Sequence, residues 1–201
     1  MAIAKKAKGK VAKKKPARPV KHTAKKRTAP KAMDEQAMMA AWQKAMTPGA
    51  GHARLEQFVG AWDTRMTFVM EPGVPPEISA GKSENRWVLG GRYLEQRFEG
   101  TSMGMPFEGI GYTAYDNIRG KYLGTWMDNF GTGLMTSDGV GKPTDKKMES
   151  ELEAFEPSGK RVRFTSKVLV QDRDHHTYAM WTKGPKGKLF RTMLIEYTRK
   201  A

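Results

Sequence analysis

The sequence predicts an all-β domain: a closed, antiparallel, up-and-down barrel of about ten strands, with a short helix packed outside it and a disordered basic tail in front. From Trp62 onward, apolar and polar residues alternate with a period of two, which is typical of strands with one buried face. Turn residues cut residues 62–199 into about ten segments of 7–13 residues. No helical segment interrupts them, so sequence neighbours should pair, and closure removes exposed edges.

The first 31 residues form the predicted tail. They contain 13 Lys and Arg and no Asp or Glu, which leaves 23 basic against 21 acidic residues in positions 32–201, or +2 of the total charge of +15. A segment of Lys, Ala and Pro buries too little apolar surface to offset about 1–2 kcal/mol of backbone entropy per residue. Residues 1–32 are therefore predicted to be disordered, and residues 33–201 to form the barrel domain.

The tail resembles the Lys/Ala/Pro-rich tails of linker histones and of some bacterial nucleoid proteins. Counterion release gives such an arm non-specific, salt-sensitive affinity for DNA, RNA or polyphosphate. Two alternatives remain: a solvated tail without a dedicated partner, and a mitochondrial targeting peptide, which favours Arg and Ser over Lys and Pro. The residues expected to contact a polyanion are Lys5, Lys6, Lys13, Lys14, Lys15, Lys25, Lys26 and Arg27.

Compartment is predicted from what the chain lacks. It has no Cys, which excludes disulfides and thiolate chemistry and fits a reducing compartment. No apolar run approaches the ~18 residues of a membrane span, and the N-terminus lacks the apolar segment of a signal peptide. The expectation is a cytoplasmic protein, associated with the nucleoid if its tail binds DNA.

A short helix is expected over residues 34–46. Met38, Trp42 and Met46 recur at helical spacing, and acidic residues stand at the positive end of the helix dipole. A Pro-Gly pair then ends the helix. We expect it to pack against the outside of the barrel; a membrane-surface or partner-binding helix is the alternative. A second helical turn is expected over residues 52–59.

The segment 107–133 predicts a hairpin around the loop 117–120, which ends in Gly. Glycines opposite Trp126 leave room for its indole and indicate an enclosed space lined by aromatic residues. Both faces are largely apolar, so alternation does not say which is inside. Pairing outward from the loop places four pairs on one face: Tyr115 with Tyr122, Thr113 with Gly124, Gly111 with Trp126, and Gly109 with Asp128.

Two later hairpins follow the same logic. Glu149, Glu151 and Glu153 are expected to face the cations of residues 161–167 across a surface hairpin. The last hairpin turns at residues 184–187. Counting back from it pairs residues of one face: Met180 with Arg191, Tyr178 with Met193, and His176 with Ile195.

Gly60-x-Trp62, placed after a short helix and at the start of the first strand, looks like the lipocalin signature. In lipocalins this Trp packs under an Arg of the last strand. The resemblance therefore implies a cation–π contact between Trp62 and either Arg191 or Arg199. More widely, the segments AMMAAWQKAMTPGAGHARLEQFVGAWD, ENRWVLGGRYLEQRFEG, GYTAYDNIRGKYLGTWMDNFGTG and FRTMLIEYTRK resemble the bacterial domain-of-unknown-function family 1579 over residues 33–200. The resemblance implies a calycin-type, lipocalin-like barrel and no established reaction; Asn129 is a mild departure from its pattern.

No motif for catalysis, phosphate binding or metal binding is present. His175 and His176 are adjacent strand residues that point to opposite faces, so they should not share a metal; His175 is expected to pair with Glu196. By analogy with haem-binding barrels, His176 is a candidate axial haem ligand, while no other cofactor is expected. Asp128 is either a buried acid or base, or a turn residue satisfied by backbone N–H groups.

Three functions follow from these features. The first is a non-enzymatic barrel that binds a small apolar or amphipathic molecule, with the basic tail binding nucleic acid. The second is a solid scaffold barrel that works through its tail, and the third is an enzyme of lipocalin type that uses Asp128 or His176. The residues predicted to line the barrel interior are Trp62, Trp87, Trp126, Asp128, His176, Tyr178, Met180, Arg191 and Met193.

Overall fold

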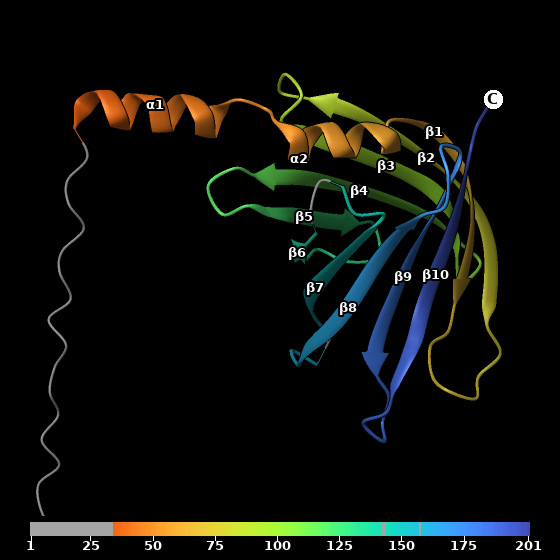
Figure 1. Ribbon diagram of the computed structural model, residues 1–201. Helices are drawn as coiled ribbons and strands as arrows, with labels where there is room; N and C mark the ends of the chain where they lie inside the picture. The colour runs from red at the N-terminus through yellow and green to blue at the C-terminus, as the bar shows by residue number, and fades with distance from the viewer. Residues whose placement is uncertain (1–33, 142–143, 157) are drawn as a thin grey trace, which may run out of the picture. The chain divides into compact units, whose positions relative to one another are not determined.

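The computed structural model describes residues 34–141, 144–156 and 158–201, and residues 35–201 form one compact unit (Figure 1). The predicted disordered tail, with all the Lys and Arg residues named for polyanion binding, lies outside the described residues. Two helices and a 3₁₀ turn lead into ten strands. The elements are α1 (Glu35–Met46), α2 (Ala50–Ala53), η1 (Arg54–Phe58), β1 (Gly60–Phe68), β2 (Glu77–Val88), β3 (Tyr93–Ser102), β4 (Met105–Asp116), β5 (Lys121–Asp128), β6 (Met135–Val140), β7 (Lys147–Phe155), β8 (Arg161–Val170), β9 (His175–Lys183) and β10 (Leu189–Arg199).

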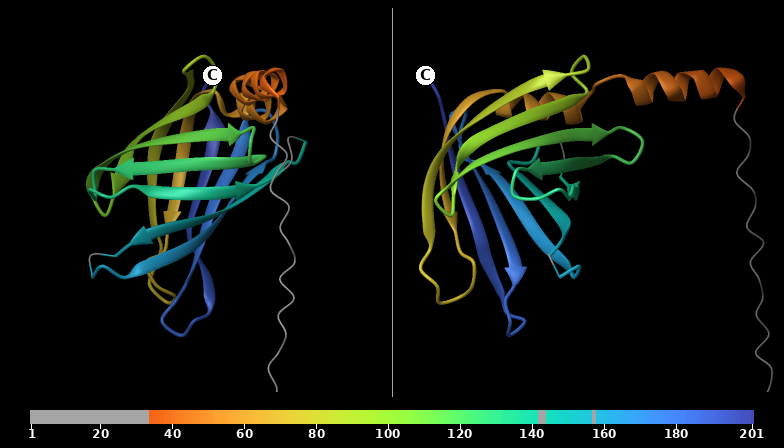
Figure 2. Two further views of the ribbon diagram at one scale, coloured as in Figure 1. Left: turned by 90° about the vertical axis from the view of Figure 1, so that its left-hand side faces the viewer. Right: turned by 180° about the vertical axis from the view of Figure 1, so that it is seen from behind.

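The ten strands form one closed antiparallel barrel in which each strand pairs with its sequence neighbours and β1 pairs with β10. This confirms the predicted up-and-down topology, and Figure 2 shows the strands wrapping around the barrel from two further directions. Short turns suffice for the connections because every pair is antiparallel. Across the surface hairpin, Glu149 lies opposite Lys167 and Glu153 opposite Arg163, as predicted, whereas Glu151 lies opposite Thr165.

The helical turns α2 and η1 close one end of the barrel. Leu55 and Phe58 of η1 are buried in one cluster with Leu94 and Tyr122 of the barrel interior. The Tyr122 hydroxyl donates a hydrogen bond of 3.2 Å to the carbonyl of Gly51. A Cβ on that glycine would lie 2.2 Å from the Tyr115 ring, so only glycine lets α2 approach this closely.

Arg199 joins the last strand to this closed end. Its guanidinium lies 4.1 Å from the centre of the Trp62 ring and donates hydrogen bonds to the carbonyls of Val59 (2.7 Å) and Gln57 (2.8 Å). The Trp62 indole donates to the carbonyl of Phe58 at 2.9 Å. The cation–π partner left open between Arg191 and Arg199 is therefore Arg199, and it also satisfies backbone carbonyls at the end of η1.

Helix α1 forms as predicted, but its apolar side chains do not pack. Met38 is 46% exposed and Trp42 57%, and none of its residues is buried. Its end is held instead by hydrogen bonds, because the Asn117 side-chain amide donates to the carbonyls of Lys44, Ala45 and Thr47. The predicted packing of this helix against the barrel is wrong: a narrow apolar stripe gains too little burial.

Among the described residues, no helix combines the length and the apolar character that a membrane span requires.

The predicted register of the last hairpin is wrong by two residues. Met180 pairs with Met193, Tyr178 with Ile195 and His176 with Tyr197. One residue of the shift comes from the turn, which spans residues 184–188 rather than 184–187, and the second comes from a bulge at Thr192. The Thr192 hydroxyl donates to the carbonyl of Val69 at 2.9 Å.

Arg191 does not lie in the interior, where it was predicted, because the longer turn sets it opposite Trp181. Arg191 pairs with Trp181 on the outer surface and is exposed. The predicted His175–Glu196 pair is also absent, because His175 contacts Asp172 at 2.9 Å and Glu196 accepts from Arg65 at 3.1 Å.

On the outer face of β3, a buried carboxylate forms a network that makes a testable contribution to stability. Glu95 is only 4% exposed and accepts from the Tyr112 hydroxyl at 2.9 Å and from Arg97 (2.9 Å) and Arg86 (3.0 Å). The Tyr112 hydrogen bond, followed by that of Arg97, lowers the pKa of Glu95 below its usual value. The folded state therefore favours the ionised carboxylate.

Glu95→Gln is expected to lower the free energy of unfolding by about 1–3 kcal/mol at pH 7, because charge-assisted hydrogen bonds are lost. Since the folded pKa lies below the unfolded value of about 4.3, the ionised group stabilises the fold above that pH and ceases to do so as pH falls through the folded pKa. Urea denaturation from pH 7 to pH 3 should show the difference shrinking on the acid side. Exposed Glu99 on the same strand is the control; an equal loss in Glu99→Gln would contradict the role of the network.

Candidate ligand-binding site

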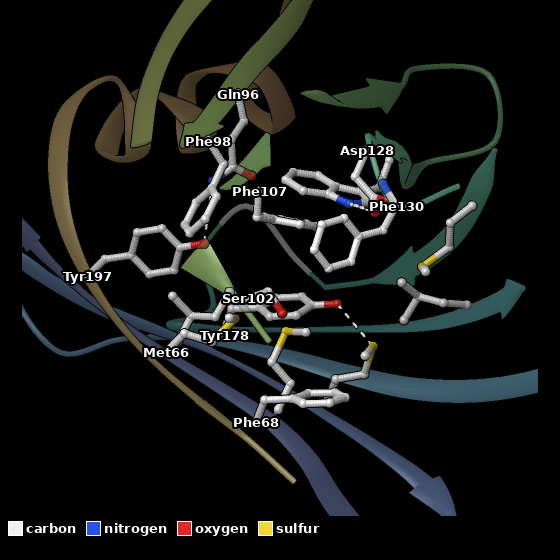
Figure 3. A pocket seen from close by; sticks show the side chains of 16 residues that line it. Met66, Phe68, Gln96, Phe98, Ser102, Phe107, Asp128, Phe130, Tyr178 and Tyr197 are labelled. Carbon is white, nitrogen blue, oxygen red and sulfur yellow. Dashed lines mark hydrogen bonds between the residues drawn. The ribbon is translucent and has the colours of Figure 1, made fainter. Parts of the chain in front are cut away.

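A cavity of about 280 Å³ lies inside the barrel, at the end opposite α2 and η1 (Figure 3). It is lined by residues at the ends of β1, β3 and β5 and at the beginnings of β4 and β6. The antiparallel order of the strands brings these positions together. All the described lining residues except Gln96, Ser102 and Asp128 are apolar or aromatic. They are Met66, Phe68, Gln96, Phe98, Ser102, Phe107, Trp126, Asp128, Phe130, Met135, Leu152, Tyr178, Met180, Met193, Ile195 and Tyr197.

Trp126 forms one wall of the cavity over two glycines. The predicted pairing is confirmed, with Gly111 opposite Trp126 and Gly109 opposite Asp128. A Cβ on Gly109 would lie 2.2 Å from Cζ2 of the indole, and one on Gly111 would lie 2.9 Å from Cε3. The glycines thus allow the indole to lie flat against strand β4, as the sequence indicated.

Asp128 holds this wall in place. One carboxylate oxygen accepts from the Trp126 indole nitrogen at 2.9 Å, and the other accepts from the backbone N–H of Phe130 at 3.0 Å (Figure 3). Of the two interpretations of Asp128, the geometry supports the turn residue bonded to a backbone N–H. Its carboxylate orients the indole and the following turn.

Aromatic rings form the mouth of the cavity. The Phe107 and Phe130 rings meet edge to face with centroids 5.1 Å apart, and Phe98 meets Phe107 at 5.9 Å. Phe130 comes from the turn after β5 and is 38% exposed. A ligand that enters from this end would pass these rings.

Three polar side chains form the inner boundary of the cavity. The Gln96 amide nitrogen donates to Ser83 Oγ at 2.9 Å and, more weakly, to the Tyr197 hydroxyl at 3.4 Å. The Tyr178 hydroxyl lies 3.7 Å from the sulfur of Met180 (Figure 3). Burial raises the pKa of Tyr178 to about 12 and raises the pKa of Tyr197 as well. Both hydroxyls are therefore protonated and uncharged at neutral pH.

A second cavity of about 100 Å³ lies on the inner side of this boundary. His176 lines it, with its ring stacked on Tyr197 at 4.3 Å and edge-on to Trp62 at 4.4 Å. Burial, and secondarily the charge of Arg199, lowers the pKa of His176 to about 3. His176 is thus a neutral imidazole, and its Nδ1 has no hydrogen-bond partner. The remaining lining residues are Leu55, Phe58, Asn85, Leu94, Gln96, Thr113, Met148, Val168, Tyr178 and Tyr197.

The structure separates the predicted interior residues by depth. Trp126, Asp128, Tyr178, Met180 and Met193 line the larger cavity. His176 lines only the smaller one, so the candidate haem ligand does not border the larger cavity.

The other predicted residues serve the closed end or the surface. Trp62 is buried with Met66, Ile195 and Tyr197 beneath the cavity. Trp87 packs against the cluster of η1, and its indole donates to Glu56. Arg191 is on the surface.

Sequence reasoning missed the aromatic mouth and part of the inner boundary. Phe98, Phe107 and Phe130 were not proposed, although Phe107 shares the alternation of Gly109 and Gly111 on β4. Tyr197 follows the alternation of Met193 on β10 and was likewise not proposed. Alternation therefore carried a signal for Phe107 and Tyr197, whereas Phe130 lies in a turn, where no period applies.

No metal site is evident in the part of the chain that the structure describes, where no group of three or more His, Asp or Glu side chains is placed to hold an ion. His175 is exposed and His176 buried, as expected for adjacent residues of one strand.

A family model described as "Protein of unknown function (DUF1579)" matches residues 47–199. Rv2717c from M. tuberculosis has a similar structure, with a TM-score of 0.60 and 17% identity over 77% of this chain and 100% of that one. The S-type phycobiliprotein lyase CPES from Guillardia theta has a TM-score of 0.50 and 11% identity over 76% of this chain and 96% of that one. At these identities the likeness shows the fold alone. Among curated proteins, none matches the sequence.

Proposed function

Because this chain belongs to the DUF1579 family, whose description names no activity, we propose a function from its geometry: the barrel binds one small apolar or amphipathic molecule. The observation that carries this proposal is the cavity of about 280 Å³ walled by aromatic and Met side chains. A barrel of this strand number commonly has room for one small ligand. The cavity favours ligand binding over a solid scaffold.

The cavity volume limits the size of the ligand. An apolar protein cavity of ~150 Å³ accommodates benzene, so this one suits a body about twice that size, such as two fused aromatic rings or a chain of roughly ten carbons. Met66, Met180 and Met193 have flexible side chains that adjust to ligands of different shape. Binding would be driven mainly by removing the apolar surface of the ligand from water.

Thermal unfolding in the presence of naphthalene derivatives and of C8–C12 chain compounds tests this function. A ligand present at about 100 times its Kd should raise the Tm by about 5–10 °C. Met193→Trp should remove the shift, because the larger side chain fills the cavity. Met127→Trp is the matched control on the outer face of the barrel, where the shift should persist. No shift with any compound would contradict ligand binding.

We also propose that the basic segment 1–31 binds nucleic acid or another polyanion, with its 13 cations and no acidic residue as support. Counterion release predicts affinity that falls steeply with salt and depends little on nucleotide sequence. Deleting residues 1–31 should abolish DNA binding in a gel-shift assay and leave ligand binding to the barrel unchanged. DNA binding that survives the deletion would contradict a role for this segment.

A further inference from the structure

The two cavities share a polar wall. Gln96, Tyr178 and Tyr197 line both of them, so one face of each side chain borders the larger cavity and another borders the smaller one. The hydrogen bond in this wall between Gln96 and Tyr197 is long, at 3.4 Å, well beyond the usual 2.9 Å. The polar end of a ligand can replace such a weak contact at little cost.

Behind the wall, His176 offers an unused hydrogen-bonding atom. His176 is 6% exposed, and its Nδ1 atom is buried without a hydrogen-bond partner. Buried polar atoms in folded proteins are nearly always paired with protein, water or ligand. The smaller cavity, of about 100 Å³, has room for a polar group or a few water molecules beside this ring.

The charged residues that line the two cavities, and those that do not, indicate which ligands fit. Among the described residues that line the two cavities there is no Lys or Arg, and Asp128 is the one acidic side chain. Arg199 lies over Trp62, with its guanidinium bonded to the carbonyls of Val59 and Gln57. A ligand anion at the polar wall would therefore be buried with no cation among the residues that line it, since the Arg199 guanidinium is already bonded to backbone carbonyls.

Given the proposed function, on which this inference rests, we propose that the ligand is an uncharged amphiphile. Its apolar body occupies the larger cavity, and a neutral hydroxyl, carbonyl or amide group replaces the contact between Gln96 and Tyr197 and faces His176. Carboxylates of the same shape are excluded. The site thus selects neutral head groups over fatty-acid or other organic anions.

Matched compounds test this selectivity at pH 7.5 by calorimetry on the full chain: 2-naphthol, naphthalene and 2-naphthoate, and the series 1-decanol and decanoate. The alcohols should bind at least about 100-fold more tightly than the carboxylates, because a buried, unpaired charge is costly. Carboxylates that bind as tightly as the alcohols would overturn the inference but leave apolar binding intact. Binding by none of the five compounds would overturn both.

Tyr197→Phe tests the head-group contact, because it removes one hydroxyl and keeps the ring that stacks on His176. The variant should weaken 2-naphthol binding by about 3- to 10-fold and leave naphthalene binding unchanged. Tyr112→Phe is the control, since its hydroxyl bonds Glu95 on the outer face. An unchanged affinity for 2-naphthol in Tyr197→Phe, or equal losses for both compounds, would contradict the proposed contact.

Discussion

Trp62→Ala is expected to lower the free energy of unfolding by about 3–5 kcal/mol, the usual range for truncating a large buried aromatic side chain. Trp62 is 1% exposed and contacts Tyr197, His176 and Arg199. The substitution creates a cavity at the closed end and removes the ring under the Arg199 guanidinium. It therefore weakens the packing of the last strand as well as that of the first.

Urea denaturation followed by far-UV circular dichroism measures this loss. Trp42→Ala is the matched control, since Trp42 is 57% exposed in α1 and its removal should change stability by less than about 0.5 kcal/mol. The loss of unfolding free energy in Trp62→Phe should fall between those of Trp62→Ala and Trp42→Ala, because phenylalanine keeps part of the buried volume. Similar losses in Trp62→Ala and Trp42→Ala would show that the closed end is not where the barrel is stabilised.

Gly109→Ala is expected to destabilise the barrel by about 1–3 kcal/mol and to abolish ligand binding. The added Cβ would lie 2.2 Å from the Trp126 ring, so the indole must leave its position. Displacing the ring breaks its hydrogen bond to Asp128 and pushes it into the cavity or out of the wall. One methyl group thus either fills the space in which the ligand should bind or removes one of its walls.

A double-mutant cycle shows whether the indole is the cause. In a Trp126→Ala background the ring is absent, so Gly109→Ala should cost much less than it does in the natural sequence. Gly133→Ala is the control, because a Cβ at Gly133 meets no atom within 4 Å. If Gly109→Ala lowers the free energy of unfolding equally in both backgrounds, the methyl group destabilises strand β4 for a reason other than its clash with Trp126.

The hairpin of β4 and β5 shows how far local pattern reaches. Its loop length sets the register, and the glycines opposite Trp126 follow from that register, so the wall of the cavity was predictable. The last hairpin shows the limit. The bulge at Thr192 depends on its hydrogen bond to Val69, more than a hundred residues away, and no local pattern contains that contact.

The sequence by itself determined the order and approximate number of the strands, the short helix before them, and which residues of one strand share a face, such as Gly109 and Gly111 on β4. Those properties depend on alternation and turn chemistry, which act over a few residues. Only the tertiary structure decided depth: Trp62 and His176 share the inward face with Met180, yet they lie in or beside the closed end while Met180 borders the larger cavity. A period of two assigns a side chain to a face, but its position along the barrel axis depends on strand stagger and on the segment that covers each end.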